Sequence, residues 1–157
     1  IIPKPVEMHV EQGNFIFNRK TCLKAGIGTR KTADFLLKRL KDGLGLVLNE
    51  ESMGDCFNQL ILEIKDNQGV GKEGYTLVIG QNITISASSE TGLFYGVQSL
   101  LQLMPPEIYG VKTTAIDSFK LPALGDFLFI SAIIPKLLLR ILSFNERVSA
   151  VNKGIFS

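Results

Sequence analysis

The sequence is poor in the residues that build metal centres and disulfide frameworks. Its 157 residues include two cysteines, one histidine and no tryptophan. Two cysteines cannot hold together a chain of this length as a disulfide scaffold. With the single histidine they also provide too few sulfur and imidazole ligands for a structural zinc site, and we expect neither a metal ion nor a cofactor. Cys22 falls in an expected strand and Cys56 in an expected loop, which favours two free thiols over a bridge.

Charge of one sign is also scarce. The chain has 17 Lys and Arg against 15 Asp and Glu, a net charge of +2. Residues 1–120 balance 13 basic against 13 acidic side chains, so the whole excess lies in residues 121–157. A neutral main body binds nucleic acid poorly, because neutralising phosphates drives most of that binding. We therefore exclude nucleic acid as a partner.

A long hydrophobic run is missing as well. The apolar stretch over residues 127–142 is interrupted by Pro135, Lys136 and Arg140, whereas a membrane-spanning helix needs about 20 apolar residues in succession. We expect no membrane span, and instead an amphipathic or buried helix over residues 136–148. The chain opens without a Met or a signal-like region, which indicates a mature form or a trimmed chain.

The composition of the sequence is that of a globular protein, and its length is that of one domain. Hydrophobic residues make up 45% and charged residues 20% of the chain, which is enough apolar surface to form a core. A length of 157 residues is that of a single domain.

Strand patterns occur along the whole main body. Alternation of apolar and polar residues predicts extended structure over residues 3–23 and strands over residues 60–65, 75–79 and 83–87. A short apolar run indicates a further strand over residues 44–48, and a last strand is expected over residues 113–118. Within residues 3–23, Gly13-Asn14 is expected to form the turn of a hairpin or to separate two consecutive strands. Gly80-Gln81 is expected to join two of the later strands into a tight antiparallel hairpin.

Two helix patterns separate the strands. Over residues 31–42 apolar side chains recur every three or four positions, and Gly43 follows as the expected C-terminal cap. Over residues 89–104 the apolar face is wider, and Ser88 or Ser89 provides the N-cap. Two prolines then end this second helix.

These elements predict an α+β fold for residues 1–120. We expect a small, mainly antiparallel sheet with two helices packed on one face. Gly92 and Gly96 in the second helix allow its backbone to approach the sheet closely. Residues 121–157 do not alternate and form an atypical apolar tail, which we expect to be irregular or helical.

No residue constellation indicates catalysis or cofactor binding. The adjacent pair Glu50-Glu51 lies in a polar loop, whereas glycosidases hold two carboxyl groups on rigid elements. His9 lies in an extended segment, so a serine nucleophile has no base within its reach. Residues 69–72 (Gly-Val-Gly-Lys) are followed by Glu73, which would repel a phosphate. We therefore predict no catalytic, cofactor-binding or metal-binding residues.

A more specific pattern runs from residue 73 to residue 103. It comprises Glu-Gly-Tyr-Thr-Leu-Val-Ile, then Ile-Thr-Ile-Ser-Ala from residue 83, and then Gly-Leu-Phe-Tyr-Gly-Val-Gln-Ser-Leu-Leu-Gln-Leu from residue 92. This pattern resembles the non-catalytic N-terminal domain of family 20 glycoside hydrolases, the β-N-acetylhexosaminidases. The resemblance covers about residues 1–110, including Ile-Pro-Lys-Pro at residues 2–5. Its most specific part, a structural signature, consists of Gly92, Phe94, Tyr95, Gly96 and Gln98.

The resemblance implies an α+β domain that precedes a (β/α)₈ barrel and packs against it. In the family, the barrel removes terminal N-acetylglucosamine or N-acetylgalactosamine with retention. The substrate's acetamido group is the nucleophile, and an adjacent Asp-Glu pair on the barrel orients it and donates the proton. The present chain contains no Asp-Glu dipeptide, and a barrel of about 250 residues does not fit in it. The resemblance also implies a secreted or periplasmic protein.

We therefore expect a non-catalytic accessory domain of a β-N-acetylhexosaminidase, inactive alone, whose natural partner is the missing catalytic barrel. Unmatched interface surface predicts homo-oligomerisation or poor solubility. The alternative is a stand-alone glycan- or protein-binding module, for which Phe57, Tyr75 and Tyr109 are the aromatic candidates. The sugar specificity of a parent enzyme does not follow from the sequence.

The tail carries no pattern of the family from residue 121 onward. One hypothesis is a truncated or out-of-frame gene product, and the other is a divergent stand-alone domain. We expect limited proteolysis to remove a tail of the first kind while the body stays intact.

Overall fold

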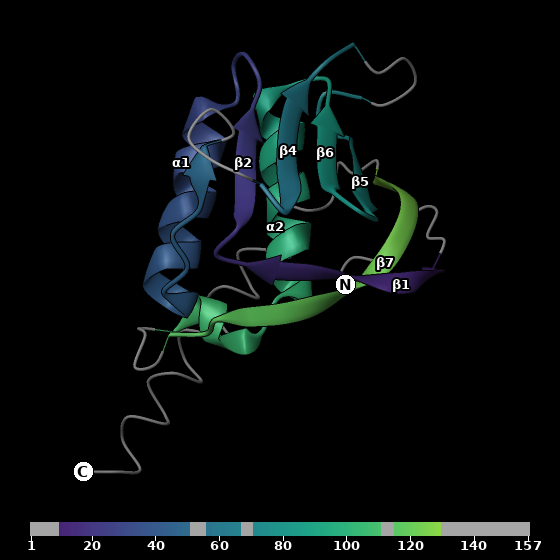
Figure 1. Ribbon diagram of the computed structural model, residues 1–157. Coiled ribbons are helices and arrows are strands. Elements are labelled where there is room, and N and C mark those ends of the chain that lie inside the picture. Colours follow the sequence, from purple (N-terminus) through teal and green to yellow (C-terminus); the bar gives the residue numbers. More distant parts are fainter. Residues whose placement is uncertain (1–9, 51–55, 67–70, 111–114, 130–157) are drawn as a thin grey trace, which may run out of the picture.

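Seven strands form one sheet in the computed structural model, which describes residues 10–50, 56–66, 71–110 and 115–129 (Figure 1). The elements follow one another as β1 (Val10–Asn18), β2 (Thr21–Ala25), α1 (Arg30–Arg39), the π-helical turn η1 (Leu40–Leu44), β3 (Asn49–Glu50), β4 (Asn58–Ile64), β5 (Tyr75–Ile79), β6 (Ile83–Ala87), α2 (Glu90–Leu103), the 3₁₀ turn η3 (Pro106–Tyr109) and β7 (Ser118–Phe129).

The sheet combines antiparallel and parallel pairs. Its strand order is β1-β7-β5-β6-β4-β2-β3. The pairs β1–β7, β7–β5 and β5–β6 are antiparallel, and the pairs β6–β4, β4–β2 and β2–β3 are parallel. The parallel half exists because the chain returns through α1 between β2 and β4, so that both strands run in the same direction. The α+β class with two helices is confirmed, and the sheet is mixed where a mainly antiparallel one was expected.

The first strand does not turn at Gly13-Asn14, so a hairpin with this turn is wrong, whereas the alternative of two consecutive strands, β1 and β2, is found. Gly13 has a φ of 125° and lies inside β1, where the pairing with β7 shifts register between Val10 and Asn14. A glycine in this conformation fits a bulge as well as a turn. The chain turns instead after Asn18, whose side-chain oxygen accepts a 2.7 Å hydrogen bond from the backbone N–H of Lys20. β1 and β2 then lie far apart in the strand order.

The first helix is longer than its pattern. It continues as η1 and ends at Gly45, which has a left-handed φ of 66°. Gly43 is therefore not the cap. A Cβ on Gly43 would lie 2.6 Å from the backbone of Ile108, so this glycine serves a close contact with η3. The strand expected over residues 44–48 is also wrong, because only Asn49–Glu50 is extended and paired there.

The second half agrees with the patterns. β4, β5 and β6 lie where alternation placed them, and β5 and β6 form the expected antiparallel hairpin. Ser89 caps α2, because its side-chain oxygen accepts a 3.1 Å hydrogen bond from the N–H of Gly92. The last strand begins at Ser118, and residues 115–117 of the expected strand are not part of it, while residues 113 and 114 lie outside the described part.

β7 crosses residue 120, where the domain boundary was placed. It runs as one strand from Ser118 to Phe129 between β1 and β5. The division into residues 1–120 and 121–157 stays a prediction, since residues 130–157, including the tail helix expected over 136–148, lie outside the described part of the chain.

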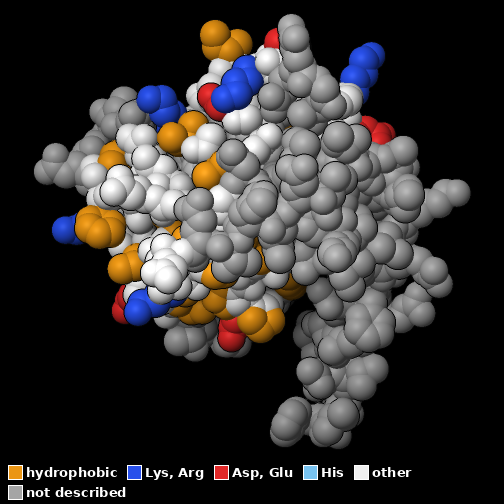
Figure 2. All heavy atoms as spheres, turned by 90° about the vertical axis from the view of Figure 1, so that its right-hand side faces the viewer, with side chains coloured by type: hydrophobic (Ala, Val, Ile, Leu, Met, Phe, Trp, Pro, Cys, Tyr) orange, Lys and Arg blue, Asp and Glu red, His pale blue; other side chains and the backbone are white. Residues whose placement is uncertain are grey.

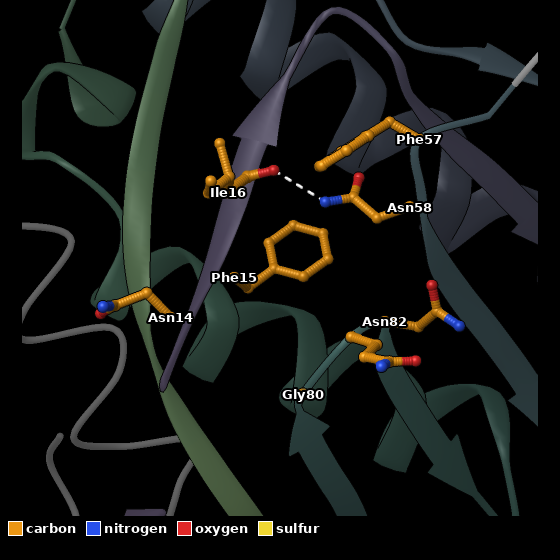
Figure 3. Close-up of a pocket in the computed structure, with 8 residues that line it drawn as sticks. Asn14, Phe15, Ile16, Phe57, Asn58, Gly80 and Asn82 are labelled. Carbon is orange, nitrogen blue, oxygen red and sulfur yellow. Dashed lines mark hydrogen bonds between the residues drawn. The ribbon is translucent and has the colours of Figure 1, made fainter. Parts of the chain in front are cut away.

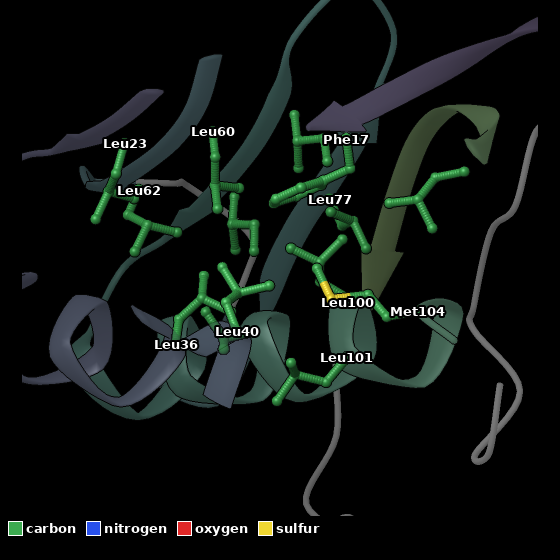
Figure 4. Packing of buried hydrophobic residues seen from close by; sticks show 14 of the residues in the cluster. Phe17, Leu23, Leu36, Leu40, Leu60, Leu62, Leu77, Leu100, Leu101 and Met104 are labelled. Carbon is green, nitrogen blue, oxygen red and sulfur yellow. The ribbon is translucent and has the colours of Figure 1, made fainter. Parts of the chain in front are cut away.

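The core lies between the sheet and the two helices (Figure 4). Leu23, Leu60, Leu62 and Leu77 project from the strands toward the helices. Leu36 and Leu40 from the first helical segment and Leu100 and Met104 from the second meet them. On the face shown in Figure 2, the exposed hydrophobic side chains of the described part lie in small groups among polar and basic ones.

The two cysteines form a disulfide, so the free-thiol interpretation is wrong. Cys22 and Cys56 have a Cα–Cα distance of 5.5 Å, which suits a bridge. Cys22 lies in β2 and pairs with Gln59 of the parallel strand β4. Cys56 lies two residues before that strand, so the parallel pairing brings the two sulfur atoms together.

Candidate functional site

The glycines of the signature bring α2 into contact with the sheet. A Cβ on Gly96 would lie 2.4 Å from Cγ2 of Ile85 and 3.1 Å from the ring of Tyr75. A Cβ on Gly92 would lie 2.3 Å from the carbonyl oxygen of Gly74. The distances of 2.4 Å and 2.3 Å are shorter than Cβ contacts in folded proteins, which confirms the expected close approach. These two signature positions therefore position the helix.

The ring of Tyr75 is buried beneath α2 and is not a binding platform. Tyr75 is 0% exposed, and its hydroxyl is hydrogen-bonded to the hydroxyl of Ser99. Burial raises the pKa of Tyr75 to about 12, and the hydrogen bond to Ser99 acts in the opposite direction. Gln98, another signature residue, is also buried. Tyr75 thus leaves the set of aromatic candidates for ligand binding.

The aromatic residues of the signature, Phe94 and Tyr95, are partly buried and extend to a ring of α1. The Phe94 ring of α2 lies 5.2 Å from the Phe35 ring of α1 and 6.3 Å from the Tyr95 ring. The Arg39 guanidinium lies 5.5 Å from the centre of the Phe35 ring. We call Phe35, Arg39, Phe94 and Tyr95 the helix-face cluster. The Phe94 ring therefore connects α2 to α1.

The aromatic members of the helix-face cluster are partly buried. Phe35, Phe94 and Tyr95 are all of intermediate exposure. Burial, assisted by the Glu73 carboxylate, raises the pKa of Tyr95. Tyr109 of η3 packs on the edge of the core, and burial raises its pKa too, against the opposing charge of Arg39.

A pocket of about 320 Å³ opens between β1, the start of β4 and the β5–β6 turn (Figure 3). Its lining consists of Asn14, Phe15, Ile16, Phe57, Asn58, Gly80, Gln81 and Asn82. None of its described lining residues is charged. The Asn58 amide nitrogen donates a 2.8 Å hydrogen bond to the Ile16 carbonyl, and the Asn82 side-chain oxygen accepts one of 2.9 Å from the N–H of Gln59.

Two residues of the pocket have unusual surroundings. The Phe57 side chain is 65% exposed, although it is a large apolar group. Asn58 is only 8% exposed, and its Oδ1 is buried without a hydrogen-bond partner in the described part of the chain. Phe57 was among the aromatic candidates of the sequence. The amides around it were not, because they come from three segments that no local pattern connects.

The remaining sequence candidates do not assemble into a site. His9, Glu51 and residues 69–70 lie outside the described part, as does the side chain of Glu50. The pKa of Glu63 is held below its usual range by Lys65, 2.5 Å away, and by the hydroxyl of Ser86. The described residues contain no group of His, Cys, Asp and Glu that could hold a metal ion. Nor does a described helix combine the length and apolar character needed to span a bilayer.

The comparison with protein families gives a match over most of the chain. Residues 1–119 match the model described as glycosyl hydrolase family 20, domain 2. A search of curated proteins finds no match.

Solved structures resemble the chain over the same region. An N-acetyl-β-hexosaminidase from Streptomyces plicatus is 26% identical with a TM-score of 0.69, and the family 20 β-N-acetylhexosaminidase from Streptomyces coelicolor is 29% identical with the same TM-score. Each match covers 84% of this chain and 26% of the other chain. The family 20 exo-β-N-acetylglucosaminidase from Vibrio harveyi, at 18% identity and a TM-score of 0.64, shares the fold over 82% of this chain and 18% of its own. The chain thus spans about a quarter of the Streptomyces enzymes.

Proposed function

This chain belongs to the glycosyl hydrolase family 20 domain 2 family, which its residues 1–119 match, and we propose on that premise that it is the non-catalytic accessory domain of a β-N-acetylhexosaminidase. The observation that supports the proposal most directly is that the structural matches cover most of this chain but only a small part of the other chains. They cover 84% of this chain but only 26% of the Streptomyces hexosaminidases. The chain therefore corresponds to one part of those enzymes.

The task of such a domain is to support the catalytic barrel, and the helix-face cluster is the surface suited to it. Phe35, Phe94 and Tyr95 form a connected aromatic group that is neither fully buried nor fully exposed. Arg39 lies over one of its rings. Aromatic and arginine side chains are the residues that protein interfaces favour at their centre. We place the contact with the barrel on the outer side of α1 and α2.

The chain alone should not hydrolyse glycosides. Glycosidases of most families need two carboxyl groups held at a set separation, and the resemblance assigns the catalytic pair to an Asp-Glu dipeptide that this sequence lacks. We expect the purified chain to release no chromophore from a chromogenic β-N-acetylglucosaminide above the buffer blank. Turnover that disappears in the variant Glu50→Gln or Glu51→Gln would overturn the proposal.

Docking can be tested with a barrel supplied separately. The barrel of the Streptomyces coelicolor enzyme, expressed without its own equivalent of this chain, is titrated with the purified chain in a calorimeter. We expect Phe94→Asp to weaken binding by roughly tenfold or more, as for a central interface residue. Ile27→Asp is the control, because Ile27 is 99% exposed in the loop after β2 and outside the cluster. Equal affinity of both variants would contradict the assigned surface.

We also propose that the protein works in the periplasm or outside the cell. The Cys22–Cys56 disulfide supports this, because such bonds persist in oxidising compartments and are rare in the cytosol. Trapping thiols with a mass-tagged alkylating reagent at the moment of cell lysis reports the state of both cysteines. Two alkylated cysteines in the freshly lysed sample would argue against this location.

A further inference from the structure

The pocket beside Phe57 has the chemistry of a site for an uncharged, hydroxyl-rich ligand. Asn14, Gln81 and Asn82, which carry amide groups, are among its lining residues, and none of the described lining residues is charged. An amide presents a donor and an acceptor in one plane, which suits two neighbouring hydroxyl groups. The volume of about 320 Å³ lies at the lower end of the range of ligand pockets, ~300–1,000 Å³. A ligand of the size of one sugar ring fits these limits.

The exposed ring of Phe57 supplies the apolar half of such a site. The C–H-rich face of a pyranose stacks on the negative face of an aromatic ring. The backbone of Phe57 is held in place by two contacts: its N–H donates a 3.0 Å hydrogen bond to the Lys20 carbonyl, and the preceding residue, Cys56, is bridged to Cys22. A fixed backbone lowers the entropy lost when a ligand orders the ring.

Asn58 adds an independent sign of a missing hydrogen-bond donor. Its Nδ2 donates a hydrogen bond to the Ile16 carbonyl, but its Oδ1 has no hydrogen-bond partner in the described part of the chain. Buried acceptors are nearly always paired in folded proteins, so an unpaired one beside a pocket requires an explanation. This oxygen exposes less than 1 Å², so a ligand hydroxyl reaches it only after a side-chain rotation. Figure 3 places Phe57 next to it, and that exposed side chain has the space to rotate.

We propose that this pocket binds one neutral sugar residue, with Phe57 stacked on the ring of the sugar and with the hydroxyl groups bonded to Gln81, Asn82 and Asn58. No lining residue belongs to α1 or α2. The site is therefore separate from the helix-face cluster, and it operates whether or not a barrel docks there. A domain of this kind would hold a glycan as well as support an enzyme.

The test is a titration of the ¹⁵N-labelled, oxidised chain with triacetylchitotriose and, separately, with maltotriose, followed by NMR. We expect saturable shifts of the backbone amides of Ile16, Gly80 and Asn82 and of the Asn58 side-chain amide. The dissociation constant should be about 1 mM, as is ordinary for a small exposed site. Binding of either sugar supports the site, and a lower dissociation constant for triacetylchitotriose shows that the site recognises acetamido groups.

Variants separate this site from a coincidental effect. Phe57→Ala should weaken binding roughly threefold to tenfold, the value of one aromatic contact, and Gln81→Ala should weaken it in the same direction. Val47→Ala, at a similarly exposed apolar residue (62%) outside the lining, should leave the affinity unchanged. Absence of saturable shifts with both sugars up to about 20 mM, or equal affinity in Phe57→Ala and Val47→Ala, would overturn the proposal. Neither result bears on barrel docking, because no barrel is present.

Discussion

At Gly96 the backbone of α2 touches side chains of the sheet, and one turn earlier, at Gly92, it approaches the backbone of Gly74 just before β5. The atoms that block a side chain differ between the two positions. At Gly96 they belong to Ile85 and Tyr75, which can move slightly, whereas at Gly92 the nearest atom is the backbone oxygen of Gly74. Close packing of this kind makes an added methyl group unfavourable, even though alanine is the better helix former.

We predict that Gly96→Ala lowers the free energy of unfolding. Overpacking costs about 1–3 kcal/mol, and the gain in helix propensity offsets about 1 kcal/mol of it. Gly92→Ala should be the more destabilising of the two, because a backbone oxygen 2.3 Å away cannot rotate aside. Urea unfolding followed by circular dichroism measures both effects.

Gly71→Ala is the matched control for these substitutions. A Cβ at this position meets nothing within 4 Å, so its effect should stay within about 0.5 kcal/mol, as at ordinary surface sites. If Gly92→Ala and Gly96→Ala were as stable as Gly71→Ala, the close contact between α2 and the sheet would be refuted.

The buried phenol of Tyr75 predicts a loss of stability at alkaline pH. Its pKa is about 12 in the folded protein and about 10 in an unfolded chain. Between these values the unfolded chain has lost a proton that the folded protein keeps. The contribution is therefore fully present below about pH 10 and is lost as the pH rises toward 12, by about 1.4 kcal/mol for each pH unit.

Tyr75→Phe should remove this part of the pH dependence. The variant also loses the hydrogen bond between Tyr75 and Ser99, which lowers the free energy of unfolding by a similar amount at every pH. Only the wild type then loses further stability as the phenol of its unfolded chain ionises. Unfolding free energies measured from pH 9 to about 12 should converge between wild type and variant as the pH rises. Parallel curves would show that the phenol of Tyr75 titrates normally.

At the scale of elements, the disulfide ties β2 to the segment that leads into β4. It closes a loop with a sequence separation of 34, and constraining the unfolded chain over such a length contributes about 3–4 kcal/mol. We expect a reducing agent to lower the urea midpoint of the wild type accordingly. The double variant Cys22→Ala, Cys56→Ala should start at the lower midpoint and respond no further to the reductant. An unchanged wild-type midpoint after complete reduction would contradict this prediction.

The elements that the sequence predicted correctly depend on neighbouring residues. Alternation in β4, β5 and β6 reflects one buried face, and the hydroxyl of Ser89 reaches an N–H only three residues away. The prediction of Gly43 as the C-cap was wrong although it too depends on neighbouring residues. Gly43 instead packs against the backbone of Ile108 in η3, and the helix extends to Gly45.

The features that the sequence did not predict depend on distant pairing. Gly13 fits a turn or a bulge, and the choice is made by β7, more than a hundred residues later. Cys22 and Cys56 meet only because β2 and β4 are parallel. The pocket has the same origin, because Phe57 and Gln81 precede β4 and β6, and these strands are parallel neighbours whose starts lie at the same end of the sheet. Phe57 alone could be named in advance, as an aromatic residue in a polar segment.

At the scale of the whole molecule, the two proposals concern separate surfaces. The helix-face cluster is aromatic and carries a cation, which suits a protein partner. The pocket is small and uncharged and is built from strands and turns, which suits a sugar. This separation means that a substitution on one surface should leave the function of the other intact.

An isolated chain exposes the surface that a barrel would cover, so we predict weak self-association through the helix-face cluster. Partly exposed apolar groups that lack their partner favour contacts between copies. Sedimentation velocity of the wild type should show an average mass that rises with concentration. Phe94→Asp should remove this rise, whereas Ile27→Asp, at an exposed apolar residue elsewhere, should not. Addition of the separately expressed barrel should dissociate the wild-type oligomer, because both partners compete for the same rings. A chain that stays monomeric, or an oligomer that the barrel leaves intact, would show that copies and barrel do not share this surface.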